Sequence, residues 1–66
     1  MPLTLADVKH LETEMVRRIE NNMREPTDPD YDEGGPEPVM TSLGYVDLWI
    51  DGEVVQNGQV IFTLEP

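Results

Sequence analysis

The stretch that decides the fold runs from residue 44 to residue 64 and reads GYVDLWI (44–50), DG (51–52), EVVQ (53–56), NG (57–58) and QVIFTL (59–64). Three runs rich in β-branched and aromatic residues are separated by the dipeptides Asp-Gly and Asn-Gly. Both dipeptides favour a two-residue type I′ turn, in which both central residues need a positive φ. The stretch therefore predicts a three-stranded antiparallel meander. The rival interpretation is a single hairpin in which residues 51–58 form a long loop.

Two tight turns also fix a register, because side chains alternate between the two faces of a strand. Trp49 then lies opposite Val54, and Val54 lies opposite Ile61. One predicted face is apolar and is interrupted only by Glu53; it carries Val46, Leu48, Ile50, Val55, Val60, Phe62 and Leu64. The other carries Tyr45, Asp47, Trp49, Val54, Gln56, Gln59, Ile61 and Thr63.

Residues 4–24 are predicted to form the one helix. Thr4 as N-cap and Asp7 at the third helical position make a capping box, and Pro26 disfavours helical geometry at the residue before it. Apolar residues recur at helical spacing, which predicts a stripe that packs on the apolar face of the sheet; they are Val8, Leu11, Met15, Ile19 and Met23, with Leu5 and Val16 widening the stripe.

Residues 26–38 read PTDPDYDEGGPEP, with four prolines, two glycines, five acids and no base. This composition predicts a flexible acidic linker. Residues 39–43 are expected to lead into the first strand.

The predicted fold class is α+β: one domain over residues 1–66, with the helix at 4–24, the linker at 26–38 and the meander at 44–64. A chain of 66 residues without cysteine can bury only about 60% of its unfolded surface and has no disulfide to compensate. A partner or a second copy of the chain would add stability.

A lone helix covers only one face of a sheet, so we expect the other face to meet solvent or another molecule. Its apolar residues are Tyr45, Trp49, Val54 and Ile61, and we predict these four as the partner-binding residues, because exposed apolar patches with Trp and Tyr mark interaction sites. The alternative is that Tyr31 or Met40 covers Trp49 within the chain.

Fourteen acids and four bases give a net charge of −10. Such a charge disfavours direct binding to nucleic acid or anionic membranes and favours a partner with a basic surface. The residues expected to provide this field are Asp28, Asp30, Asp32, Glu33, Asp47 and Asp51. Alternatives are mimicry of nucleic-acid phosphates, a salt-loving source, or acids that only aid solubility.

The acids at positions 28, 30 and 32 have the spacing that opens a calcium-binding loop, but Glu33 and Val39 stand where such a loop needs Gly and a bidentate Glu. We therefore expect no metal. No nucleophile–base pair or glycine-rich phosphate loop accompanies Ser42 or His10, so we predict neither an enzyme nor a cofactor.

The sequence lacks the apolar run of roughly 20 residues that a membrane span needs, and its first residues lack a signal-peptide pattern. We therefore expect a cytoplasmic protein, in the host cytoplasm if the source is viral. The leading functional hypothesis is a small acidic protein-binding module, an inhibitor or adaptor from a virus or mobile element that acts on a basic host protein. The alternative is a structural protein that forms a homodimer or larger homo-oligomer through the exposed sheet face.

Overall fold

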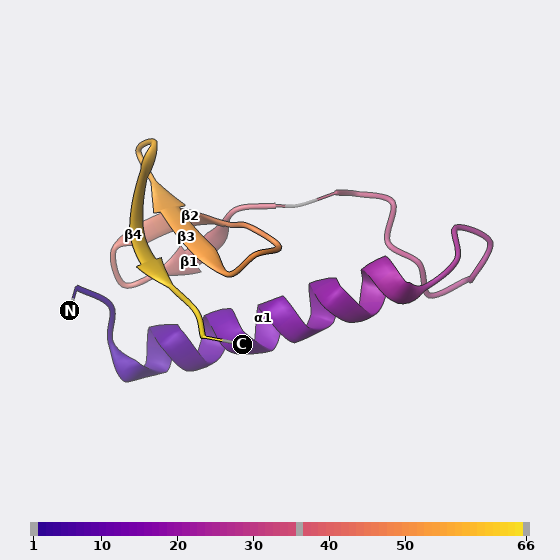
Figure 1. The fold of residues 1–66 in the computed structure, drawn as a ribbon, viewed down its shortest axis with the longest axis horizontal. Helices are drawn as coiled ribbons and strands as arrows, with labels where there is room; N and C mark the ends of the chain where they lie inside the picture. The colour runs from indigo at the N-terminus through magenta and orange to yellow at the C-terminus, as the bar shows by residue number, and fades with distance from the viewer. Residues whose placement is uncertain (1, 36, 66) are drawn as a thin grey trace.

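The computed structural model describes residues 2–35 and 37–65; Met1, Pro36 and Pro66, which belong to the predicted domain, lie outside the described residues. The elements follow in the order α1 (Leu5–Met23), β1 (Val39–Thr41), β2 (Gly44–Leu48), β3 (Glu53–Gln56) and β4 (Gln59–Thr63). The strands form one antiparallel meander in sequence order (Figure 1). The α+β class is confirmed, but the prediction of three strands is wrong, because the described chain contains four.

Helix α1 starts at the predicted capping box. The Asp7 N–H donates to Thr4 Oγ1 and the Thr4 N–H donates to Asp7 Oδ2, both at 3.1 Å. The helix ends at Met23, where Arg24 takes an extended conformation. Both ends therefore agree with the sequence, since capping residues and proline act on the backbone directly.

Strand β1 is the element that the sequence left unassigned. It pairs with β2 through Val39 opposite Val46 and Thr41 opposite Gly44. The Thr41 hydroxyl donates to the Gly44 carbonyl at 2.8 Å and accepts from the Leu43 N–H at 3.1 Å. A threonine before the turn and a glycine after it are ordinary turn residues, so a hairpin signal was present at this position.

The turn between β2 and β3 is longer by one residue than predicted. The Trp49 N–H donates to the Glu53 carbonyl and the Gly52 N–H donates to the Trp49 carbonyl, both at 2.9 Å. Ile50, Asp51 and Gly52 thus form a three-residue loop with only Gly52 at positive φ, the arrangement of a type I turn followed by a glycine bulge. The predicted pairing of Trp49 with Val54 is wrong; Leu48 lies opposite Val54 instead.

The second turn has the predicted form but β4 contains a bulge. Asn57 and Gly58 both have positive φ, at 53° and 78°, and Val55 lies opposite Val60 as expected. The register then shifts, so that Val54 faces Phe62 rather than Ile61. A bulge exchanges the faces of the residues that follow it, which returns Phe62 to the inner side of the sheet.

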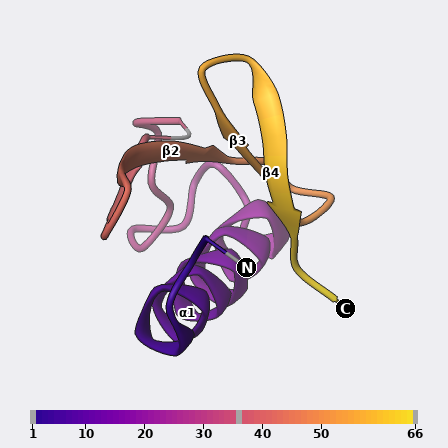
Figure 2. The same cartoon turned by 90° about the vertical axis from the view of Figure 1, so that its left-hand side faces the viewer.

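The core lies between α1 and the inner face of the sheet (Figure 2). Its buried apolar members are Leu3, Leu11, Met15, Val39, Val46, Leu48, Val54 and Leu64. Of the predicted inner face, Val46, Leu48 and Leu64 are buried, Phe62 is partly buried against the core, Val55 is half-buried, and Ile50 and Val60 are exposed. The register that was predicted would have placed Glu53 inside, and the observed register places Val54 there instead.

The N-terminal end of α1 is joined to the β1–β2 turn by Asp7. Its carboxylate accepts hydrogen bonds from the Ser42 N–H at 3.0 Å and from the Ser42 hydroxyl. These bonds, with those of the capping box, lower the pKa of Asp7 to about 2. The same carboxylate therefore caps the helix and fixes its position on the sheet.

Candidate interaction surface

The side of the sheet that points away from the core is the outer face, which we define as Met40, Tyr45, Asp47, Glu53, Val55, Val60 and Thr63, together with Trp49 just beyond β2. Tyr45 is 64% exposed and Trp49 is 57% exposed. Because Trp49 is open to solvent, the alternative in which Tyr31 or Met40 covers it is wrong. The outer face therefore presents two aromatic side chains beside two carboxylates.

The predicted partner-binding row is not formed as a row. Tyr45 and Trp49 are exposed, whereas Val54 is fully buried in the core and Ile61 is partly buried against it. The cause is the extra residue in the first turn, because a shift of one residue moves a side chain to the opposite face. The prediction that Val54 and Ile61 are free for a partner is wrong, and the binding role of Tyr45 and Trp49 stays a prediction.

Trp49 forms one wall of a hollow of about 260 Å³ that Arg18, Glu37, Asp47 and Leu48 also line. The guanidinium of Arg18 donates to the Leu48 carbonyl at 2.7 Å and to the Glu37 carbonyl, and the Arg18 side chain is only 14% exposed. The positive charge of Arg18 is thus held against backbone oxygens. The carboxylates of Asp47 and Glu37 take part in no ion pair within the described residues.

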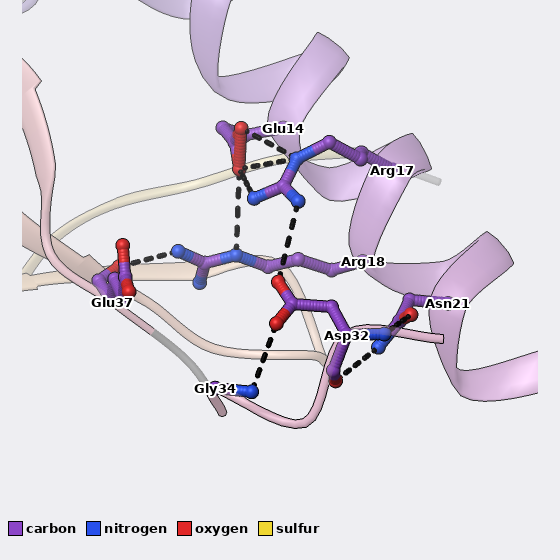
Figure 3. A network of polar contacts seen from close by, with 7 residues as sticks. All are labelled: Glu14, Arg17, Arg18, Asn21, Asp32, Gly34 and Glu37. Atoms are coloured by element: carbon purple, nitrogen blue, oxygen red, sulfur yellow. Dashed lines mark hydrogen bonds and ion pairs between the residues drawn. The ribbon is translucent and has the colours of Figure 1, made fainter. Parts of the chain in front are cut away.

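The linker is anchored to α1 through Asp32, which contacts Asn21 and Arg17 of the helix (Figure 3). The Asn21 side chain accepts from the Asp32 N–H at 2.7 Å and donates to the Asp32 carbonyl at 3.1 Å. Arg17 lies 3.8 Å from the Asp32 carboxylate, which also accepts from the Gly34 N–H at 2.8 Å. The described part of the linker is therefore held against α1 at Asp32; the flexibility of the linker stays a prediction.

A second part of the same network lies on the helix. The Arg17 guanidinium forms a bidentate ion pair with the Glu14 carboxylate, with the shortest N–O distance at 2.7 Å. The Arg18 Nε lies 3.7 Å from the same carboxylate. The hydrogen bonds from Arg17, opposed by desolvation, lower the pKa of Glu14. Three of the four basic residues of the chain lie in the last two turns of α1 or just beyond it, and two of them are paired with acids or with the backbone.

The six predicted electrostatic residues do not form a single patch of free charge. The Asp32 carboxylate lies 3.8 Å from the Arg17 guanidinium of the helix. The Asp28 carboxylate accepts from the Asp30 N–H at 2.8 Å, and the Asp51 carboxylate accepts from the Glu53 N–H at 3.0 Å. Asp30, Glu33 and Asp47 are exposed. Among the described residues no three His, Cys, Asp or Glu side chains are grouped so that they could hold a metal ion.

The charge is divided unevenly along the chain. Ten of the fourteen acids and none of the four bases follow residue 24, so the linker and sheet carry the whole net charge and the helical segment is neutral overall.

Within the described residues, no helix has the length and apolar character needed to cross a bilayer. No protein-family model, curated protein or solved structure matches the chain.

Trp49 and Asp47 could be predicted from the sequence as site residues, but the positions of Arg18 and Glu37 beside them could not. Arg18 falls among helix residues of mixed character, and the composition of residues 26–38 says nothing about their path. The Arg18 guanidinium joins the linker to the end of β2, since it donates to the carbonyls of Glu37 and Leu48. The one sequence feature that indicated this role is the position of Arg18 beside the apolar stripe of the helix. An arginine at such a position can bury its aliphatic stem while its guanidinium donates to oxygen acceptors.

Proposed function

We propose that this protein is a non-enzymatic binding module for a protein with a basic surface, and that the hollow beside Trp49 receives a lysine or arginine side chain of that partner. The observation that carries the proposal is the exposed indole at the wall of a hollow that Asp47 and Glu37 also line, neither of them in an ion pair within the described residues. A cation over an indole face gains from the electrons of the ring as well as from nearby carboxylates.

The charge of the chain supports the same kind of partner. Ten acids without a base follow residue 24, and such a field raises the rate of association with a basic protein while repelling nucleic acid. We propose that the protein is an inhibitor or adaptor encoded by a virus or mobile element. Its strong negative charge suits a basic host protein, such as a nucleic-acid-binding one. The acids of the linker and sheet then steer the basic partner toward the protein, and Trp49 and Tyr45 provide the affinity of the complex.

The test uses the single tryptophan of the chain as its own reporter. Titration with hexa-arginine at about 20 mM salt is expected to change the Trp49 fluorescence saturably and more weakly at about 200 mM, because salt screens exposed charges. Asp47→Asn should weaken binding. An unchanged fluorescence, or equal binding by Asp47→Asn, would show that the hollow does not receive cations.

Capture of partners from a cell lysate then separates the hollow from general charge. Trp49→Ala is expected to lose the captured basic protein, while Ile50→Ala should keep it. Ile50 is the matched control, since it is the neighbouring residue and is 56% exposed against 57% for Trp49, yet it does not line the hollow. Equal capture by the two variants would leave charge alone as the basis of binding.

The structural alternative, a homo-oligomer formed through the sheet, is not favoured on the outer face. Asp47 and Glu53 lie there among the apolar residues, so two copies meeting face to face would bring like charges together. A different surface is better suited to a second copy.

A further inference from the structure

One flank of α1 carries apolar side chains that no described part of the chain covers. Leu5 is 69% exposed, Val16 55%, Ile19 43% and Met23 81%. Residues 16, 19 and 23 follow one another at spacings of three and four, and residue 5 lies two turns before Glu12 on the same line. We call Leu5, Glu12, Val16, Ile19 and Met23 the free seam; a heptad-type line of this kind is how one helix meets another.

The free seam is distinct from the two sides of α1 that are already occupied. At about 100° per residue, Leu11 and Met15 point to the core, whereas Arg17 and Asn21 point to the linker on the opposite flank. Figure 2 shows the sheet above the helix, with the linker to one side and β4 to the other. Figure 1 shows the C-terminal turns of α1 extending beyond the sheet, which cannot cover them.

The distribution of charge indicates which molecule fits this flank. Two copies of a chain with a net charge of −10 repel each other wherever linker or sheet surfaces meet. The helical segment holds all four bases of the chain and as many acids, so contact between two helices is the approach that meets least repulsion. A basic partner, in contrast, would be drawn to the linker and sheet.

The charges beside the seam also select an orientation. Lys9 and Glu20 are both exposed and lie on the same edge of the free seam. An antiparallel pair related by a two-fold axis sets Leu5 level with Met23 of the second copy and brings Lys9 next to Glu20 of the second copy. The symmetry repeats that ion pair at the other end. In a parallel pair with its two-fold axis along the helices, the edge that carries Lys9 and Glu20 would face the opposite edge of the second copy, so this ion pair would not form. The antiparallel arrangement is therefore the complementary one.

We propose that the protein forms an antiparallel homodimer through the free seam of α1, with the outer face of each sheet left open. Glu12 is the one acid within the seam, and it limits the strength of the dimer. The proposal is independent of the cation-binding hollow, since neither Trp49 nor Asp47 takes part in it.

Sedimentation equilibrium of the full chain from about 5 to 500 μM tests the proposal, and the mass is expected to double across this range. Val16→Gln/Ile19→Gln should remain a monomer at every concentration. The matched control is Val60→Gln/Met40→Gln, which removes two apolar side chains of similar exposure, 52% and 53%, from the outer face and should dimerise as the parent does. Circular dichroism confirms that each variant is folded.

Charge reversal tests the orientation. Lys9→Glu or Glu20→Lys alone should weaken the dimer at least tenfold, and the double variant should restore it. Glu12→Leu should tighten the dimer at least tenfold. A monomer at 500 μM, or a dimer lost only in the outer-face control, would overturn the proposal; a dimer that tolerates Lys9→Glu would overturn the antiparallel arrangement.

Discussion

Replacement of Gly52 by alanine tests the contact between the first turn and Leu64, the residue that follows β4. Gly52 has a φ of +95°, and a Cβ at this position would lie 2.8 Å from the carbonyl oxygen of Leu64. The Gly52 carbonyl in turn accepts from the Leu64 N–H at 2.8 Å. Alanine would therefore strain the turn and also push the end of the chain away from it.

Gly44 is the matched control for this change. It has the same φ of +95°, but its added Cβ would meet only the amide of Gln56 at 3.9 Å, an ordinary contact. Gly44→Ala should therefore cost only the backbone strain, about 1–2 kcal/mol. Gly52→Ala should cost that amount and roughly 1–2 kcal/mol more, because it breaks a hydrogen bond and loosens the buried Leu64 side chain.

Urea unfolding followed by Trp49 fluorescence and far-ultraviolet circular dichroism measures both free energies of unfolding. A total stability of about 3–10 kcal/mol is expected for a chain of this length, so the difference between the variants is a large share of it. In thermal unfolding, the difference in free energy between the two variants lowers the midpoint temperature of Gly52→Ala by about 4–8 °C per kcal/mol. If the two variants lose equal stability, Leu64 does not close on the first turn, and the contact that accompanies the three-residue loop is wrong.

Three further outcomes follow from the same contacts. Val54→Ala should cost about 2 kcal/mol in urea unfolding because it empties a core position, while Val60→Ala should cost less than about 0.5 kcal/mol; the reverse order would restore the register expected from the sequence. Arg18→Met should cost about 2–3 kcal/mol, since two backbone carbonyls lose a charged donor, and a change below about 0.5 kcal/mol would deny Arg18 a tethering role. The pKa of Asp7 is lowered to about 2 from an unperturbed 3.8, so its stabilising contribution is present above about pH 4 and is lost as the pH falls through 2. Ser42→Ala should raise that pKa toward 3.8 in an NMR titration, and an unchanged value would show that Ser42 is not the cause.

The helix and the second turn could be predicted from neighbouring residues. Thr4, Asp7 and Pro26 act on backbone groups within a few positions of themselves. Asn57 and Gly58 accept positive φ at little cost and form the predicted turn. No information from the rest of the chain was needed at these sites.

The first turn shows where local signals were insufficient. Asp-Gly is compatible with a two-residue turn and with a three-residue turn whose last residue is glycine. The Asp51 side chain accepts from the Glu53 N–H, and the Leu64 N–H donates to the Gly52 carbonyl; these contacts accompany the longer turn. The first contact is local, but the second comes from the far end of the meander.

The sequence by itself determined the α+β class, the limits of the helix, the Asn-Gly turn and the strong negative charge, because each depends on local conformational preference or on a simple count of residues. Tertiary structure decided which side chains are free. Val54 became core because one extra loop residue exchanged the faces of β3, while Trp49 kept its exposed position. Burial of Val54 instead of Glu53 is favoured by the free energy of removing apolar surface from water and of leaving a carboxylate in it, a balance that exists only when all four strands and the helix are in place.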